Sequence, residues 1–333
     1  MARKCAFLRV SKSQHLPTRR RKPVHPLRTE CWFDHMVDTP KLHDLLFATL
    51  GARVRSLTGS QASLEDFSTP MGDPGLLGPQ SVAWRVHAHF TAMLVGGLSS
   101  LMVQALHPRA LAAVWDHSNF KQNLKARLGR TAYFVAATTY GGRSMALRAI
   151  ERVNAVHARA VGIDLQGRPY AANEPDLIRW VHLVEVHSFL TAYQHLSHQP
   201  LRSAQCDGYI AEMRQIGHLL GALHLPASWR DTEQALLAYE GELVCDARTR
   251  ETVQVIENYP VEMLDKPFMH GVMQAAFDTM PSWALQRLGR PPSCELARRA
   301  RRAALQLATI PVQWMLDQQG VAATARQRLS ASR

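Results

Sequence analysis

Sixteen histidines make metal binding and acid–base chemistry the first functions to consider. The chain has no H-E-x-x-H motif and no C-x-x-C pair, which are common signatures of zinc sites. His182 and Glu185 stand three residues apart, but in the reverse order of the Glu-x-x-His motif of di-iron proteins and without a second copy. His87 and His89 are two apart, so they would point to different sides of a helix. The spacing therefore predicts neither a conventional zinc site nor a carboxylate-bridged di-metal site.

One histidine falls on the apolar face of an expected helix. Residues 143–161 have helical periodicity, and the inward stripe consists of Ala146, Ile150, Val153, His157 and Ala160. A neutral imidazole among aliphatic side chains either hydrogen-bonds a buried partner or binds a metal. His157 is therefore the candidate metal ligand, and a hydrogen-bonded core histidine is the alternative.

A charged residue on the preceding expected helix also needs a partner. Arg127 and Thr131 are four residues apart and share a helix face that continues into apolar residues such as Phe134. Burying an unpaired charge is costly, and the only carboxylate in residues 74–150 is Asp116. Arg127 therefore pairs with Asp116, reaches solvent, or meets an anion that the chain does not contain, such as a cofactor carboxylate.

Several short motifs occur in a recognisable order. They are Gln104-Ala105-Leu106-His107-Pro108, His117-Ser118-x-Phe120, Arg127-Leu128-x-Arg130-Thr131, the run from Val156 to Gly162, and Gly167-x-x-Tyr170-x-Ala172-x-x-Pro175-x-Leu177-x-x-Trp180-Val181. Their order and spacing resemble the MpaB-type oxygenase family, which includes the catalytic domain of latex-clearing protein, a rubber oxygenase. The resemblance covers residues 72–193, with a weaker similarity at residues 280–283.

This resemblance implies a globin-like helical fold that carries a b-type haem. It makes His157 the axial iron ligand, and it makes Arg127 and Thr131 the Arg-x-x-x-Thr pair that supports the haem environment. The two unusual features of the sequence agree with these roles. A lone histidine on an apolar stripe suits a proximal ligand, and an unpaired arginine suits a haem propionate.

The resemblance also implies an enzyme that acts with dioxygen on an apolar, unsaturated or isoprenoid-like substrate, either a small molecule or a polymer. Two positions depart from the pattern of latex-clearing proteins. Arg130 stands where those proteins have a lysine, and Asp116 is the only acid near the place of their glutamate base. Arg130 and Asp116 are therefore the candidate catalytic residues. A haem-binding sensor or carrier without turnover is the alternative function.

Composition and periodicity predict an all-α fold. An apolar share of 46% with a charged share of 20% excludes wholesale disorder. Helical patterns cover most of the chain after Ser81, and the one weak strand-like alternation is Thr252–Ile256. The expected helices are 81–106, 124–139, 143–161, 175–196, 203–223, 231–247, 262–288 and 293–318. We therefore expect one helical domain over residues 36–333.

The uncharged run from Phe90 to Leu106 could be mistaken for a membrane-spanning helix. It has only seventeen residues, which is at the lower limit of about 17–25 for a span, and glycines and serines interrupt it. A helix buried within the protein is the better interpretation. We therefore expect no transmembrane segment.

The net charge of +12 is concentrated at the N-terminus, where residues 1–30 hold nine Lys/Arg and one acid. This distribution predicts a disordered basic tail over residues 1–35, with no nucleic-acid partner. Lys22–Pro26 follows the arginine run where an export signal would have apolar residues. The five cysteines are odd in number and widely spaced, which suits a reducing compartment, so we expect a cytoplasmic protein.

Overall fold

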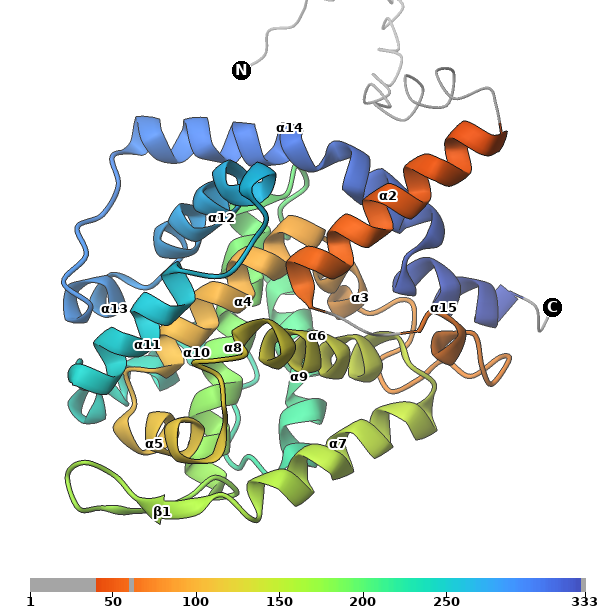
Figure 1. The fold of residues 1–333 in the computed structure, drawn as a ribbon. Helices are drawn as coiled ribbons and strands as arrows, with labels where there is room; N and C mark the ends of the chain where they lie inside the picture. The colour runs from red at the N-terminus through yellow and green to blue at the C-terminus, as the bar shows by residue number, and fades with distance from the viewer. Residues whose placement is uncertain (1–39, 60–62, 331–333) are drawn as a thin grey trace, which may run out of the picture. The chain divides into compact units, whose positions relative to one another are not determined.

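The computed structural model describes residues 40–59 and 63–330 (Figure 1). The predicted basic tail, residues 1–35, lies outside this range. The chain from Asp44 onward forms one unit that is almost entirely helical. The prediction of a single all-α domain is therefore confirmed.

The described elements are helices with one short pair of strands. The first half contains α2 (Pro40–Thr58), η1 (Glu65–Phe67), α3 (Val82–His87), α4 (Phe90–Gln104), α5 (Pro108–His117), α6 (Leu124–Tyr140) and α7 (Arg143–His157). The strands β1 (Val161–Ile163) and β2 (Pro169–Ala171) follow, and then α8 (Pro175–Leu196). The remainder contains α9 (Ser203–Leu220), α10 (Trp229–Leu237), η2 (Glu240–Glu242), α11 (Ala247–Glu257), η3 (Met263–Asp265), α12 (Lys266–Asp278), α13 (Ser282–Arg287), α14 (Glu295–Gln319) and α15 (Val321–Ser330).

The core is built on α4, which packs along α8. The two helices approach closely because Gly96 has no side chain. A Cβ atom at this position would lie 2.9 Å from both the Cα of Phe189 and the carbonyl oxygen of Ser188. Most of α4 is buried, as expected for this uncharged segment. Within residues 40–59 and 63–330, no single helix is long and apolar enough to span a membrane; α4 and α5, which are bent by 105°, meet the criterion only as a pair.

The expected helix over 81–106 is two helices. The break falls at Ala88 and His89, where His89 becomes the N-cap of α4 and its Nδ1 accepts a hydrogen bond from the backbone N–H of Ala92 at 3.3 Å. A histidine in this position satisfies one of the free N–H groups of the first turn. The hydrophobic periodicity of the sequence does not show this break, because apolar residues continue through both helices.

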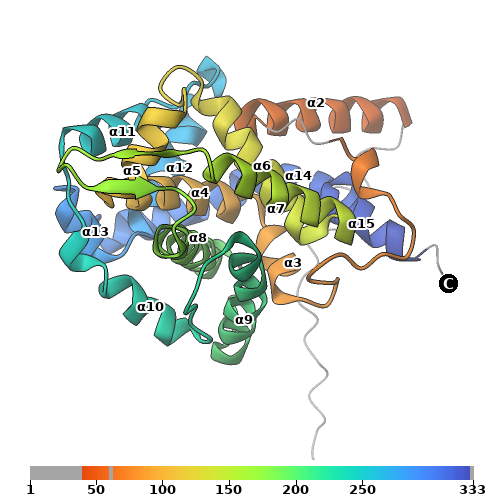
Figure 2. The same cartoon turned by 90° about the horizontal axis from the view of Figure 1, so that it is seen from below.

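The expected helix over 143–161 is wrong at its C-terminal end. α7 ends at His157, and Gly162 lies in β1 instead of capping the helix. The segment expected to be a loop, 164–172, contains β2, which pairs antiparallel with β1 (Figure 2). Three-residue strands are too short to produce a readable alternation.

The strand-like run Thr252–Ile256 is helical and belongs to α11. Its β-branched residues are compatible with a helix because Thr252, Val253 and Ile256 have the spacing of one buried helix face. Further along, the expected helix over 262–288 is divided into α12 and α13. Tertiary packing, rather than intrinsic strand propensity, decides these segments.

The chain reverses at Gly141–Gly142, so that α6 and α7 pack against each other as a helical hairpin (Figure 1). The backbone N–H of Arg143 donates to the Asp73 carboxylate at 2.7 Å and thereby fixes the start of α7. The beginning of α6, with Arg127, and the end of α7, with His157, are the ends of the two helices away from this reversal.

Candidate functional site

Arg127 is the charged residue of an otherwise mainly apolar pocket. It lies in the first turn of α6, which begins after the N-cap Asn123. Its guanidinium donates to the hydroxyl of Ser118 at 3.1 Å, and no carboxylate of the described residues is bonded to it. Burial, and then the nearby charge of Arg130, lower the pKa of Arg127 to about 10. The side chain is therefore still cationic at neutral pH, without an anionic partner.

Asp116 does not pair with Arg127. One of its carboxylate oxygens accepts a hydrogen bond from the hydroxyl of Tyr170 at 2.7 Å, and the other lies 3.5 Å from the guanidinium of Arg248. Of the three alternatives for Arg127, pairing with the nearest acid in the sequence is thus not realised. Arg127 is partly exposed and lies in an open pocket, so contact with solvent and a bound anion are the two alternatives that remain.

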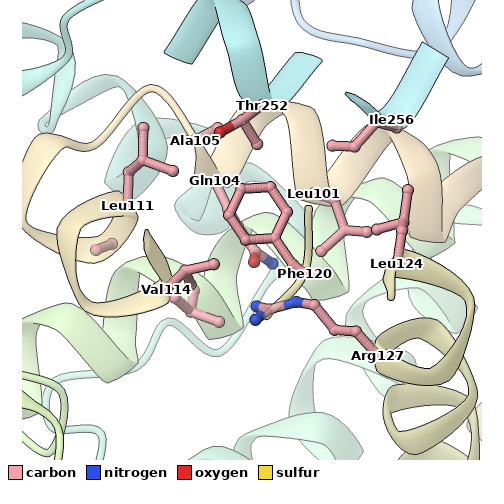
Figure 3. Close-up of a pocket in the computed structure, with 12 residues that line it drawn as sticks. Leu101, Gln104, Ala105, Leu111, Val114, Phe120, Leu124, Arg127, Thr252 and Ile256 are labelled. Carbon is pink, nitrogen blue, oxygen red and sulfur yellow. The ribbon is translucent and has the colours of Figure 1, made fainter. Parts of the chain in front are cut away.

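The pocket around Arg127 is formed by five helices (α4, α5, α6, α8 and α11) and a loop, and its cavity volume is about 40 Å³. This space holds only a few water molecules and is far below the about 300–1,000 Å³ that is usual for ligand pockets, so a larger ligand would have to move the walls apart. Figure 3 shows the guanidinium of Arg127 directed into the pocket. The lining side chains are Leu101, Gln104, Ala105, Ala110, Leu111, Val114, Phe120, Leu124, Arg127, Val181, Thr252 and Ile256.

Thr252 adds an unsatisfied polar atom to the pocket wall. Its hydroxyl is buried and has no hydrogen-bond partner among the residues that the structure describes. Thr252 and Ile256 come from α11 at i, i+4 spacing, so both face the same way. The sequence did not predict this part of the pocket wall, because the β-branched residues of the segment resemble a strand.

His157 is the last residue of α7, and its Nδ1 is buried without a hydrogen-bond partner in the described part of the chain. Burial, and then the charge of Arg127, lower the pKa of this imidazole below its ordinary value. The alternative of a hydrogen-bonded core histidine is therefore not what the structure contains. His157 does not line the pocket itself, but the charge of Arg127 reaches it.

Thr131 and Arg130 are both exposed, and neither lines the pocket. The hydroxyl of Thr131 donates to the backbone carbonyl of Arg127 at 3.3 Å. This bond ties the two members of the Arg-x-x-x-Thr pair together within one helical turn. Arg130 acts on the site only through its charge, which contributes to the lowered pKa of Arg127.

Four further histidines lie in or next to the motif segments. His107, His182 and His187 are buried in the core. His117 is exposed instead, and its Nε2 donates to the carbonyl oxygen of Val161 at 3.0 Å. No cluster of three or more histidine, cysteine or acidic side chains suited to a metal ion occurs among the described residues.

Glu185 is a partly buried carboxyl group that the sequence patterns did not single out as a site residue. It lies on α8, four residues after the pocket residue Val181, and so on the same side of the helix. No hydrogen bond to its carboxyl group occurs within residues 40–59 and 63–330, and burial raises its pKa to about 7. The sequence did contain a signal for this residue, because Glu185 is an acid on a helix face that is otherwise mostly apolar.

Comparison with known proteins agrees with the motifs and the fold. The family model described as "ER-bound oxygenase mpaB/B'/Rubber oxygenase, catalytic domain" matches residues 84–310, which is more than half of the chain. Comparisons with curated proteins and with solved structures give no match. The matched region contains α4–α13 and hence every residue of the site described above. The chain therefore belongs to the family of ER-bound MpaB/B′ oxygenases and rubber oxygenase catalytic domains.

Proposed function

We propose that this protein is a haem b-dependent oxygenase in which His157 holds the iron. The observation that carries the proposal is the partly buried, cationic Arg127, which has no carboxylate partner among the described residues and lies close to an imidazole with an unpartnered nitrogen. Both groups have unmet bonding capacity in a mainly apolar setting. A haem would satisfy both, since its iron takes an imidazole ligand and its propionates pair with arginine.

Bound haem supplies the dioxygen chemistry in this proposal, and the protein supplies binding, orientation and exclusion of water. Arg127 would hold a propionate through its positive charge, and the hydroxyl of Ser118 orients its guanidinium by accepting a hydrogen bond from it. His157 serves as a neutral ligand, because burial and Arg127 disfavour its protonated form. The Thr131 hydroxyl stabilises the helical turn that carries Arg127.

The pocket wall supports an apolar substrate. Only Gln104, Arg127 and Thr252 bring polar side chains to the space, and the remaining lining residues are aliphatic or aromatic. A polar substrate would leave most of its hydrogen-bonding groups unsatisfied there. The substrate class that we propose is therefore an unsaturated or isoprenoid-like hydrocarbon, either a small molecule or the end of a polymer, which reacts with dioxygen.

A haem-binding sensor or carrier without turnover is a second candidate. The observation in its favour is that neither predicted catalytic residue lines the pocket, since Arg130 is exposed and Asp116 is engaged by Tyr170 and Arg248. Their catalytic roles stay predictions. Asp116 would have to leave both partners before it could accept a proton from a substrate.

Dioxygen uptake separates the two functions. The haem-loaded protein is mixed with a short unsaturated isoprenoid hydrocarbon in an oxygen-electrode cell, and the saturated hydrocarbon of equal length serves as the control. An oxygenase consumes dioxygen only with the unsaturated compound, and its products contain the added oxygen. A protein that binds haem but consumes no dioxygen with any unsaturated hydrocarbon would exclude the enzyme and leave the sensor or carrier.

A further inference from the structure

The hairpin of β1 and β2 has an outward face without polar side chains. Val161 and Ile163 are exposed by 55% and 65%, and they alternate with Gly162, which faces inward. Their partners across the strand pair are Ala171 and Pro169. An antiparallel sheet with one face in water normally carries polar residues on that face. All four outward positions of this hairpin are apolar.

The apolar surface extends beyond the strands. Leu165 in the connecting turn is 56% exposed, and Val156 in the last turn of α7 is 61% exposed. We call Val156, Val161, Ile163 and Leu165 the hairpin patch. Single exposed apolar residues are common, but four of them within ten residues of sequence are typical of an interaction surface.

Hydrogen bonds hold the turn between the strands in one conformation, and this conformation keeps Leu165 exposed. The buried carboxylate of Asp164 accepts hydrogen bonds from the backbone N–H groups of Gln166 and Arg168 at 2.9 and 2.8 Å. It also accepts one from the Nε of Arg168 at 2.9 Å. Gly167 supplies the positive φ of 77° that closes the turn.

The inner face of the hairpin is fastened to α5, which also forms part of the pocket wall (Figure 2). His117 donates to the carbonyl oxygen of Val161 at 3.0 Å, and Arg109 donates to the carbonyl oxygen of Pro169 at 2.9 Å. The hydrogen bond between Asp116 and the tyrosine of β2 adds a third connection. The hairpin patch therefore has a fixed position relative to the pocket.

Three exposed arginines lie near Val156 at one end of the hairpin patch. Arg148 and Arg152 are exposed and precede Val156 at intervals of four residues, so they continue its side of α7. Arg159 is exposed in the turn that leads to β1. None of these three arginines forms an ion pair with the residues that the structure describes. An apolar face with arginines at its edge is the arrangement that binds anionic lipid surfaces.

We propose that the hairpin patch and its arginines dock the protein on the surface of an anionic phospholipid bilayer. The apolar side chains enter the boundary between headgroups and acyl chains, and Arg148, Arg152 and Arg159 contact lipid phosphates. A second copy of the chain fits less well, because self-association through this face would bring the same arginines together. Docking would place α5 and the pocket next to a phase in which apolar substrates dissolve. The supply of substrate from the membrane rests on the proposed function, whereas the binding to the membrane does not.

Vesicle cosedimentation of the full chain tests the proposal. The vesicles contain either phosphatidylcholine alone or phosphatidylcholine with 30% phosphatidylglycerol. We expect binding to the anionic vesicles, and the double variant Ile163→Glu/Leu165→Glu should bind at least tenfold more weakly. Both side chains are exposed, so the variant retains its fold, which circular dichroism checks. Leu307→Glu is the matched control, because Leu307 is 68% exposed on α14, and it should bind as the unaltered chain does.

The arginines have a test of their own. Replacing Arg152 and Arg159 with Gln should weaken binding to anionic vesicles by about fivefold for each charge, and it should leave binding to neutral vesicles unchanged. Equal vesicle binding by the hairpin variant and the unaltered chain would overturn the proposal. A dimer in light scattering that the hairpin variant abolishes would assign the patch to a second copy instead. Haem content is measured on the same samples, so that a failure of the haem proposal is distinguished from a failure of docking.

Discussion

The guanidinium of Arg127 on α6 and the imidazole of His157 at the end of α7 are close enough for the charge of Arg127 to lower the pKa of His157. Burial is the larger cause of that lowering, and the guanidinium adds to it. The imidazole is consequently neutral near pH 7, with a nitrogen lone pair free to bind a metal. One positive charge therefore has two roles in the proposed site: it favours the ligand form of His157 and binds a haem carboxylate.

Replacing Arg127 with Gln should weaken haem binding without unfolding the protein. The change removes a charge-assisted hydrogen bond to a propionate, which contributes about 1.5–3 kcal/mol, or roughly 10- to 100-fold in affinity. The rate of haem transfer from the variant to an excess of a competing apo-globin measures the loss. Arg130→Gln is the control, because Arg130 is exposed and outside the pocket. Equal haem loss from both variants would show that only the general charge of α6 matters.

Glu185→Gln should make the protein more stable at neutral and alkaline pH. Burial raises the folded-state pKa of Glu185 to about 7 from an ordinary value of 4.5. Glu185 therefore ionises at a lower pH in the unfolded chain than in the folded protein. The free energy of unfolding falls as the pH rises from 4.5 to 7, and above pH 7 this group has little further effect on it. Over this pH range the ionisation of Glu185 lowers the free energy of unfolding by about 3 kcal/mol in total.

Urea unfolding of both proteins at pH 5 and pH 8 checks this prediction. The neutral amide removes the titration, so the stability advantage of the variant over the unaltered chain should be larger at pH 8 than at pH 5. A pH-independent difference between the two proteins would mean that Glu185 has a partner or solvent access that keeps its pKa ordinary.

Gly96→Ala and Gly97→Ala should have opposite effects on stability. A Cβ at position 96 would lie 2.9 Å from backbone atoms of α8, whereas a Cβ at position 97 would lie 3.9 Å from the nearest atom, in the ring of Phe189. The first change forces α4 and α8 apart and should cost about 1–3 kcal/mol. The second should stabilise α4 by up to about 1 kcal/mol. Thermal unfolding of the two variants measures the difference, and equal midpoints would refute the close contact.

The sequence was sufficient to predict the helical fold and to single out His157, Arg127 and Thr131. Periodicity revealed the apolar faces, and the scarcity of acids near Arg127 left Asp116, solvent or an external anion as its possible partners. What could not be predicted depends on tertiary contacts. The partners of Asp116 are Tyr170 and Arg248, which are distant in sequence.

The hairpin also escaped prediction, for a physical reason. Its strands have three residues each, and their stability comes from anchoring to α5 instead of from their own alternation. The wall supplied by α11 was missed because β-branched residues suggested a strand. In both segments the environment, and not local propensity, determines the conformation.

The central claim is that His157 binds haem iron, and haem content per chain tests it most directly. The purified protein is incubated with haemin, freed of excess, and its visible absorption spectrum is recorded before and after reduction with dithionite. We expect about one haem per chain with a strong Soret band for the unaltered protein and for the control His270→Ala, because His270 is exposed on α12. His157→Ala should lose stoichiometric haem. Full haem content with an unchanged spectrum in His157→Ala, or no haem uptake by the unaltered protein, would contradict the account.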